Sequence, residues 1–277
     1  MPSIAILFGL LSALTWGAGD FNGGLAVKRS NPYGVIAVAH SISLILLLIT
    51  VFIVGEPIPS LHDWLWGGAS GLAGGVGLML LYRALAEGRM SVAAPVSAVV
   101  AAVLPVLVGL LQDGVPGLWI LIGFMLALIA VWLVSGGEGL TIRFDDLRMP
   151  VIAGIAFGAF FIFIERASRT ALLWPLIAVR IVSVSTMLGY ALLTRQDWVP
   201  KRESMVPLLL SSVLDTFGNA FYALSARTGR LDVAAVLGAL YPGATVLLAW
   251  VFLKENISRI QTIGILLALG AIILLTL

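Results

Sequence analysis

The chain contains one segment twice, and the two copies begin Gly88-Arg89-Met90-Ser91-Val92-Ala93-Ala94 and Gly229-Arg230-Leu231-Asp232-Val233-Ala234-Ala235. Residues 88–134 and 229–275 align without a gap at an offset of 141 residues, with 14 of 47 positions identical. Apolar composition raises chance identity, but the absence of gaps and the paired glycines Gly123 and Gly264 favour a true repeat. Hydrophobic internal repeats are typical of secondary transporters, in which the substrate site lies between the two halves.

The composition indicates that lipid is the solvent of this chain. Hydrophobic residues make up 60% of it and charged residues 11%, with a mean hydropathy of +1.09. A soluble domain of this length carries about a quarter charged residues. The net charge of +2 is too small to indicate a nucleic-acid partner, and the absence of cysteine excludes disulfides and thiolate metal sites. The N-terminus lacks the basic region of a signal peptide, so the first apolar run is expected to be a retained span.

Charges, glycines and prolines divide the chain into apolar runs long enough to cross a hydrocarbon core of about 30 Å. We predict ten spans, at residues 3–27, 33–54, 64–86, 91–111, 117–135, 150–166, 174–194, 206–226, 232–253 and 257–277. The longest polar stretch, 136–149, is interpreted as a linker between two five-helix halves, 1–135 and 150–277. An odd number of spans per half makes the second half enter the membrane from the opposite side, so the repeats are expected to be inverted.

The distribution of basic residues predicts an orientation in the membrane. The loops after the odd-numbered spans hold 11 Lys and Arg, whereas the other side, with both termini, holds four. The positive-inside rule therefore places both termini outside the cytoplasm, although the bias is nearly absent in the second half.

Several motifs resemble those of a known family. They are Leu14-Thr15-Trp16-Gly17, the passage from Tyr82-Arg83-Ala84-Leu85 to Ser91-Val92-Ala93-Ala94-Pro95, and the ending that starts at Leu253-Lys254-Glu255. The chain resembles the EamA-domain branch of the drug/metabolite transporter superfamily along its whole length. The resemblance implies a central cavity lined by helices one, three, four, six, eight and nine, and export or exchange of amino acids, metabolites or drugs. Two features depart from the family pattern: basic residues are missing before helix one and after helix two, and Asp113 follows helix four where Gly-Glu is common.

A polar stripe in the eighth span is the first candidate site. Asp215, Asn219 and Tyr222 follow one another at helical spacing and share one face. A carboxylate at mid-membrane costs about 2.5–3.5 kcal/mol on insertion scales, so such residues usually face an interior cavity. The alternative is a polar seam that joins helices by hydrogen bonds.

Two further pairs of polar residues lie inside spans. Asp20 and His40 lie at similar depth and could bond to each other, and Asp20 is either a coupling or binding carboxylate or a helix cap. Arg180 and Glu165 are expected to form an ion pair, or Arg180 binds a substrate carboxylate. Glu165 also corresponds to Asp20 at an offset of 145 residues.

Aromatic residues on the predicted cavity helices complete the candidate set. We expect a mixed apolar and aromatic cavity that stacks on a side chain or holds a cation. Its expected aromatic residues are Trp16, Tyr82, Phe161, Tyr222 and Tyr241.

These observations predict a ten-span α-helical transporter of the prokaryotic cytoplasmic membrane. It is expected to export or exchange small metabolites such as amino acids by alternating access, without ATP, with a proton as the coupling ion through Asp20 or Asp215. The expected partners are a small-molecule substrate and the lipid bilayer, with no nucleic acid, no cofactor and no metal, in a monomer or homodimer. No enzymatic motif is found, and no catalytic residue is predicted. The alternatives are uptake of a cationic or amine-bearing solute and a membrane enzyme acting on lipid head groups.

Overall fold

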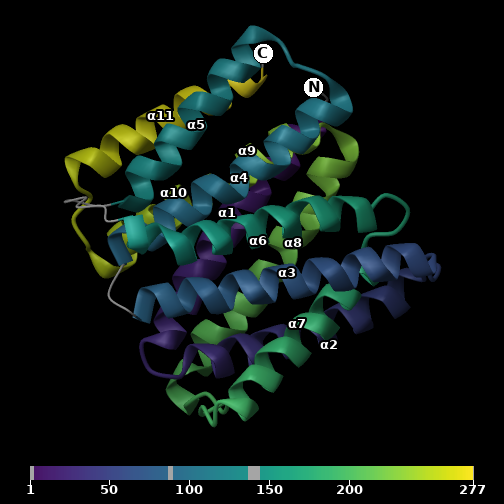
Figure 1. Ribbon diagram of the computed structural model, residues 1–277. Helices are drawn as coiled ribbons and strands as arrows, with labels where there is room; N and C mark the ends of the chain where they lie inside the picture. Colours follow the sequence, from purple (N-terminus) through teal and green to yellow (C-terminus); the bar gives the residue numbers. More distant parts are fainter. Residues whose placement is uncertain (1–2, 87–89, 137–143, 277) are drawn as a thin grey trace.

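The computed structural model describes the backbone of residues 3–86, 90–136 and 144–276, and the side chains of residues 3–81, 96–135 and 147–276. Every regular element in these residues is a helix, as Figure 1 shows. The elements are α1 (Ser3–Val27), α2 (Pro32–Val54), α3 (Leu61–Ala86), α4 (Met90–Asp113), α5 (Leu118–Gly136), α6 (Phe144–Ala167), α7 (Leu173–Leu193), the short 3₁₀ helix η1 (Arg202–Ser204), α8 (Met205–Thr228), α9 (Leu231–Gly238), α10 (Tyr241–Leu253) and α11 (Arg259–Thr276).

Nine spans in the described residues are long and apolar enough to cross a membrane, with α9 and α10 counting together as one. The exception, α8, is 24 residues long but carries polar side chains along its length. It must also cross, because α7 ends at one end of the bundle and α9 begins at the other. The chain is therefore an all-α protein of ten crossings, as predicted.

Two predicted boundaries are wrong. The sixth helix begins at Phe144 rather than at 150, so the end of the predicted linker is helical. The ninth span is not one helix, because α9 ends at Gly238 and α10 begins at Tyr241. Pro242 has no backbone N–H to donate to the carbonyl of Gly238, and this missing bond lies at the break.

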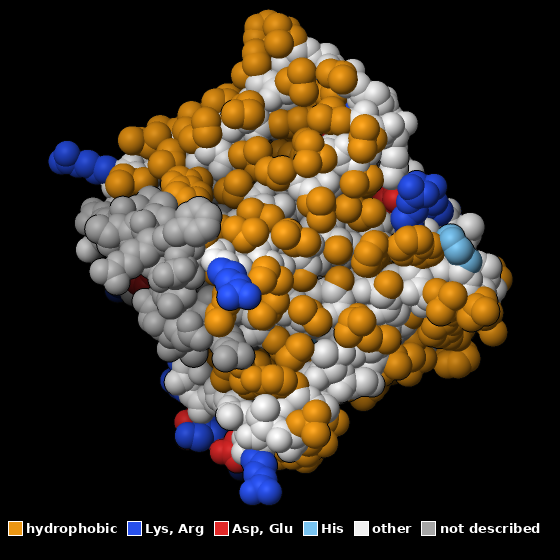
Figure 2. Space-filling view, viewed as in Figure 1, with side chains coloured by type: hydrophobic (Ala, Val, Ile, Leu, Met, Phe, Trp, Pro, Cys, Tyr) orange, Lys and Arg blue, Asp and Glu red, His pale blue; other side chains and the backbone are white. Residues whose placement is uncertain are grey.

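The loops gather at two opposite ends of the bundle. At the Ser30 end, the α1–α2 loop meets the α7–α8 loop, and the Ser30 Oγ lies 2.9 Å from the Ser204 Oγ. At the Glu56 end, the carboxylate of Glu56 accepts the backbone N–H groups of Leu172 and Leu173 at 2.7 and 2.8 Å. Figure 2 shows a broad hydrophobic surface, with most of the visible charged side chains at its margins. This surface is the band that faces the acyl chains.

The helices of the two halves exchange partners. Helix α1 packs most extensively on α8, and its counterpart α6 packs most extensively on α3. Helix α2 packs on its own counterpart α7, and α5 packs on α11, which lie side by side in Figure 1. Such reciprocal packing is what a two-fold relation between repeats produces, and five crossings per half make the repeats inverted.

Glycines at equivalent positions allow the closest of these contacts. A Cβ on Gly9 would lie 2.8 Å from the Leu237 Cδ1, and one on Gly154, at an offset of 145 residues, would lie 2.6 Å from the Val100 Cβ. Small residues let membrane helices approach closely where the hydrophobic effect between them is weak. The contact of α1 with α9 and that of α6 with α4 therefore depend on the same sequence feature.

Candidate functional site

The candidate site is built on α8, whose polar residues form one stripe. Ser212, Asp215, Thr216 and Asn219 recur at spacings of three and four residues, so they share a face of the helix. The stripe faces α2 and α7, and it joins the two halves of the protein.

A buried ion pair lies at the centre of this stripe. The Nη2 atom of Arg180, from α7, donates to Oδ2 of Asp215, and its Nε donates to the Ser43 Oγ of α2 at 2.9 Å. Arg180 is 4% exposed, whereas the Asp215 side chain is 31% exposed. Asn219 donates to the other carboxylate oxygen of Asp215 at 3.1 Å. The guanidinium is thus sealed among the helices, while the carboxylate lies at the edge of the accessible part of the protein.

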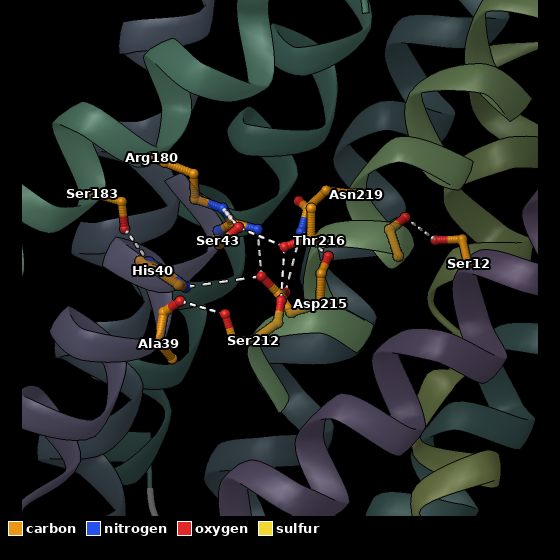
Figure 3. Close-up of polar contacts among 11 residues, drawn as sticks. Ser12, Ala39, His40, Ser43, Arg180, Ser183, Ser212, Asp215, Thr216 and Asn219 are labelled. Atoms are coloured by element: carbon orange, nitrogen blue, oxygen red, sulfur yellow. Dashed lines mark hydrogen bonds and ion pairs between the residues drawn. The ribbon is translucent and has the colours of Figure 1, made fainter. Parts of the chain in front are cut away.

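His40 belongs to the same cluster, which Figure 3 shows in close-up. Its Nδ1 lies 2.7 Å from the Ser183 Oγ, and its Nε2 lies 3.9 Å from Oδ2 of Asp215. The imidazole therefore lies between a hydroxyl of α7 and the carboxylate of α8. With Arg180 already paired to Asp215, a neutral His40 leaves the charge of the pair balanced.

A chain of hydroxyl groups fixes α8 against α2. The Ser43 Oγ lies 2.5 Å from the Thr216 Oγ1, which donates to the backbone oxygen of Ser212. The Ser212 Oγ in turn donates to the backbone oxygen of Ala39 at 2.6 Å. Buried polar groups are costly unless they are bonded, so this chain specifies how the two helices pack.

Two predicted pairings are wrong. Arg180 does not pair with Glu165, because the face of α7 that carries Arg180 meets α8, whereas Glu165 bonds to Nε of Arg169 on its own helix at 2.8 Å. His40 does not bond to Asp20, because its ring turns toward α7 and Asp215. Depth in the membrane had predicted both pairs, but depth does not fix the direction in which a helix face points.

An aromatic layer lies beside the polar cluster. The rings of Trp16 and Phe161 are 5.6 Å apart, those of Trp16 and Tyr222 are 5.5 Å apart, and those of Phe161 and Tyr222 are 4.8 Å apart. Tyr222 is fully buried and donates to the backbone oxygen of Phe161. The break between α9 and α10 follows directly, since a Cβ on Gly238 would lie 3.1 Å from the Trp16 ring.

The expectation that Asn219 and Tyr222 line an open cavity is therefore wrong. Asn219 is 3% exposed and Tyr222 is 0% exposed, because the aromatic layer and α9 cover them. Of the other predicted residues, Phe161 is 7% exposed and Tyr241, at the start of α10, is half-buried. The side chain of Tyr82 lies outside the described residues.

Asp20 lies one turn beyond Trp16, toward the Ser30 end. It is exposed, and it makes no hydrogen bond or ion pair with the described residues. It lies within electrostatic reach of Asp215, because a Cβ on the preceding Gly19 would be 3.4 Å from the backbone nitrogen of Asp215. Two carboxylates of different helices thus share one region, and only Asp215 has a cationic partner among the described residues.

Accessibility differs sharply between the two ends of the site. Every residue of α9 is buried, whereas α10 contains no buried residue. A cavity of about 340 Å³ opens at the Ser30 end between α1 and α8, bordered by Asn22 and Leu210. The Ser30 end is therefore the open side of the site, and the aromatic layer with α9 closes the Glu56 end.

Sequence reasoning missed several polar residues near the site. Ser43 and Ser183 were not predicted, although Ser43 follows His40 by one helical turn and shares its face. Asp232 was also missed, and it is fully buried at the start of α9, where Arg230 donates to it at 2.7 Å. These hydrogen bonds raise the pKa of the Arg230 guanidinium above its ordinary value. No group of metal-ligating side chains occurs among the residues that the structure describes.

An inverted repeat of helices that buries an ion pair beside an accessible carboxylate is the architecture of a membrane transporter. The model of the EamA-like transporter family matches residues 3–136 and 149–277, one match for each half. The chain belongs to this family and is a membrane transporter of small solutes.

Two further comparisons agree with the fold. An uncharacterized protein of Methanocaldococcus jannaschii is 28% identical over 130 residues, which cover 47% of this chain and 92% of that relative. A protein of known crystal structure superposes with a TM-score of 0.79 at 16% identity, over all of this chain and 97% of the other. The M. jannaschii relative is thus about as long as one half of this chain.

Proposed function

We propose that the protein is a secondary transporter that exports or exchanges small metabolites, amino acids or similar amine-bearing solutes, by alternating access. The observation that carries this proposal is the exposed, unpaired Asp20 beside the half-exposed Asp215. With Arg180 charged and His40 neutral, the cluster and Asp20 together carry one net negative charge, from two carboxylates and one guanidinium. Such a site favours a cation, and an ammonium group is the cation that amino acids and amines share.

The solute would enter from the Ser30 end and bind above the aromatic layer. Its ammonium group would contact Asp20, while its remaining atoms would lie against Trp16 and Tyr241. Phe161, Tyr222 and Asn219 would form the floor, because they are buried beneath this region. Arg180 would act through Asp215, holding that carboxylate in place rather than binding the solute itself, since its Nε and Nη2 donors already have partners.

Alternating access would require the two ends to exchange their accessibility. The break at Ala239–Leu240 supports this step, because α9 and α10 can move separately about it. Inverted repeats supply the second state, since exchanging the conformations of the halves turns a protein open at one end into one open at the other. A proton on Asp20 would be the coupling ion, released when the ammonium group binds.

Counterflow in proteoliposomes tests this function. Liposomes loaded with an unlabelled amino acid should accumulate the labelled form of the same amino acid, and a panel of amino acids, amines and sugars identifies the class. A thermal-shift screen supports the choice, because a ligand at 100 times its dissociation constant adds about 2.7 kcal/mol of stability. The absence of counterflow for the whole panel, with the lipid chemically changed, would favour the lipid-enzyme alternative. The direction of gradient-driven flux in oriented vesicles separates export from uptake.

A further inference from the structure

Asp20 and Glu165 occupy equivalent positions in the two halves. Asp20 lies four residues after Trp16, and Glu165 lies four residues after Phe161, with both pairs related by the offset of 145 residues. The rings of Trp16 and Phe161 pack on each other, with their centroids 5.6 Å apart. The pseudo-two-fold axis therefore passes near this ring pair, and one carboxylate lies a helical turn away on each side of the aromatic layer.

The two carboxylates are in opposite states. Asp20 is exposed and unpaired among the described residues, whereas Glu165 is 6% exposed and bonded to Nε of Arg169. The residues around Glu165 are sealed as well, since Ile164 and Ala167 have no exposed surface. Equivalent positions in an inverted repeat should exchange these states when the transporter opens at its other end.

Glu165 also has an unsatisfied oxygen. Its Oε2 and the Oγ of Ser168, one turn later, are buried without a hydrogen-bond partner, and the Arg166 Nε lies 3.9 Å from Oε2. A buried polar atom without a partner costs about 1–3 kcal/mol, so natural proteins retain one chiefly where it has a function. A carboxylate oxygen that lacks a donor is a site at which a proton can bind.

A route from water to this region begins at the Glu56 end. A cavity of about 550 Å³ lies between the α2–α3 connection and the end of α6, and its walls include Arg166 and Arg169. These arginines lie between the cavity and Glu165, so release of the Arg169 bond would open the carboxylate to the cavity.

We propose that Glu165 is the second proton-binding carboxylate of the transport cycle, used when the protein opens at the Glu56 end as Asp20 is used when it opens at the Ser30 end. The proposal rests on the proposed function. In the opposite state, Arg169 leaves Glu165, a proton from water binds Oε2, and the turn of α1 that carries Asp20 becomes sealed. When the protein returns to the present state, that proton leaves to water at the Glu56 end and Arg169 bonds to the carboxylate again.

The charged and titratable groups around Glu165 fit this role. Arg166 and Arg169 face it from its own helix, and the hydroxyl of Tyr222 in α8 lies within its electrostatic reach. His62 and Asp63 of α3 line the same cavity as the two arginines, and Asp63 is occupied by hydrogen bonds from Ser60 and Thr170.

Glu165→Gln separates coupling from transport. Gln keeps the shape of the side chain but cannot take up a proton, so we expect counterflow to persist while proton-driven accumulation falls at least tenfold. Asp113→Asn is the matched control, because Asp113 is an exposed carboxylate at the same end and should leave both activities unchanged. Full proton-driven accumulation by Glu165→Gln, with normal counterflow, would overturn the inference and leave the proposed function intact. Absence of counterflow in the wild-type protein would instead reject the proposed function.

Cysteine labelling tests the exchange of states directly, because the chain contains no cysteine. Gly24→Cys reports on the Ser30 end, where a Cβ would have no atom within 4 Å, and Ser168→Cys reports on the buried position beside Glu165. In otherwise wild-type protein, an impermeant maleimide should label Gly24→Cys readily and Ser168→Cys slowly. Adding Glu165→Gln removes the bond to Arg169, and we expect labelling at Ser168→Cys to rise on the order of fivefold while labelling at Gly24→Cys falls. Unchanged labelling at both positions would contradict the exchange, whatever the effect on melting temperature.

Discussion

Removing either partner of the Arg180–Asp215 pair should have unequal effects on stability. Asp215→Asn keeps the shape of the side chain but leaves the guanidinium of Arg180 uncompensated in a site where it is 4% exposed. Arg180→Met leaves the Asp215 carboxylate, which is 31% exposed and keeps a hydrogen bond from Asn219. The first change strands a sealed charge, and the second strands a charge that can reach solvent.

The difference in exposure sets the magnitudes. Breaking a buried ion pair by removing one partner costs about 3–5 kcal/mol when the remaining charge stays buried, which is the case for Asp215→Asn. The partly exposed carboxylate left by Arg180→Met should cost about 1–3 kcal/mol. The double variant leaves neither charge, so its loss should be about 2 kcal/mol and far below the sum of the single losses.

Equilibrium unfolding in mixed micelles measures these values, with the eight tryptophans as fluorescent reporters. Ser185→Ala on the same helix is the control, because the exposed Ser185 hydroxyl bonds only to the carbonyl of Ile181 within α7. It should change the free energy of unfolding by less than about 0.5 kcal/mol. A larger loss for Arg180→Met than for Asp215→Asn, or strict additivity in the double variant, would refute the assignment of the buried pair.

Three further predictions follow from the packing and the site. Asp20→Asn should abolish proton-driven accumulation in liposomes with little change in protein yield or melting temperature, because Asp20 bonds to no described residue; normal accumulation would exclude its coupling role. Gly17→Val should destabilise the protein by about 1–3 kcal/mol, because a Cβ there would lie 2.5 Å from the Ala244 Cβ, whereas Gly24→Ala should be neutral in the same unfolding assay. Glu56→Gln should lower stability by about 1–2 kcal/mol while leaving the transport rate per folded molecule unchanged, because it weakens the carboxylate cap on the first N–H groups of α7; an unchanged melting temperature would contradict this role.

The sequence was sufficient for the architecture because the decisive information is periodic. The gapless repeat predicts two equivalent halves, and an odd number of spans per half makes them inverted. The break in the ninth span was harder to predict, because Pro242 lies in only one of the two copies and its counterpart, Ala101, lies within the continuous helix α4. A proline inside a membrane helix is often tolerated, so its presence alone does not indicate a break.

The site was predicted only in part. The spacing of Asp215 and Asn219 placed both on one polar face, which the structure confirms. The partners of that face come from α2 and α7, and no pattern within α8 specifies which helices it meets. Arg180 was paired with Glu165 on depth alone, although the angle around each helix axis decides which side chains meet. Burial of Tyr222 was equally inaccessible, because it depends on the close approach of Trp16 and Phe161 from different halves.

The most direct test of the account is the electrical response of proteoliposomes on a solid-supported membrane to a jump in amine-bearing solute. Amino acids and amines chosen by the thermal-shift screen should give transient currents with wild-type protein, because solute binding and proton release move charge at Asp20. Asp20→Asn should give no current, while Asp113→Asn should give the wild-type current. Currents of equal size from wild-type protein and Asp20→Asn would contradict the claim that this carboxylate lies at the centre of transport.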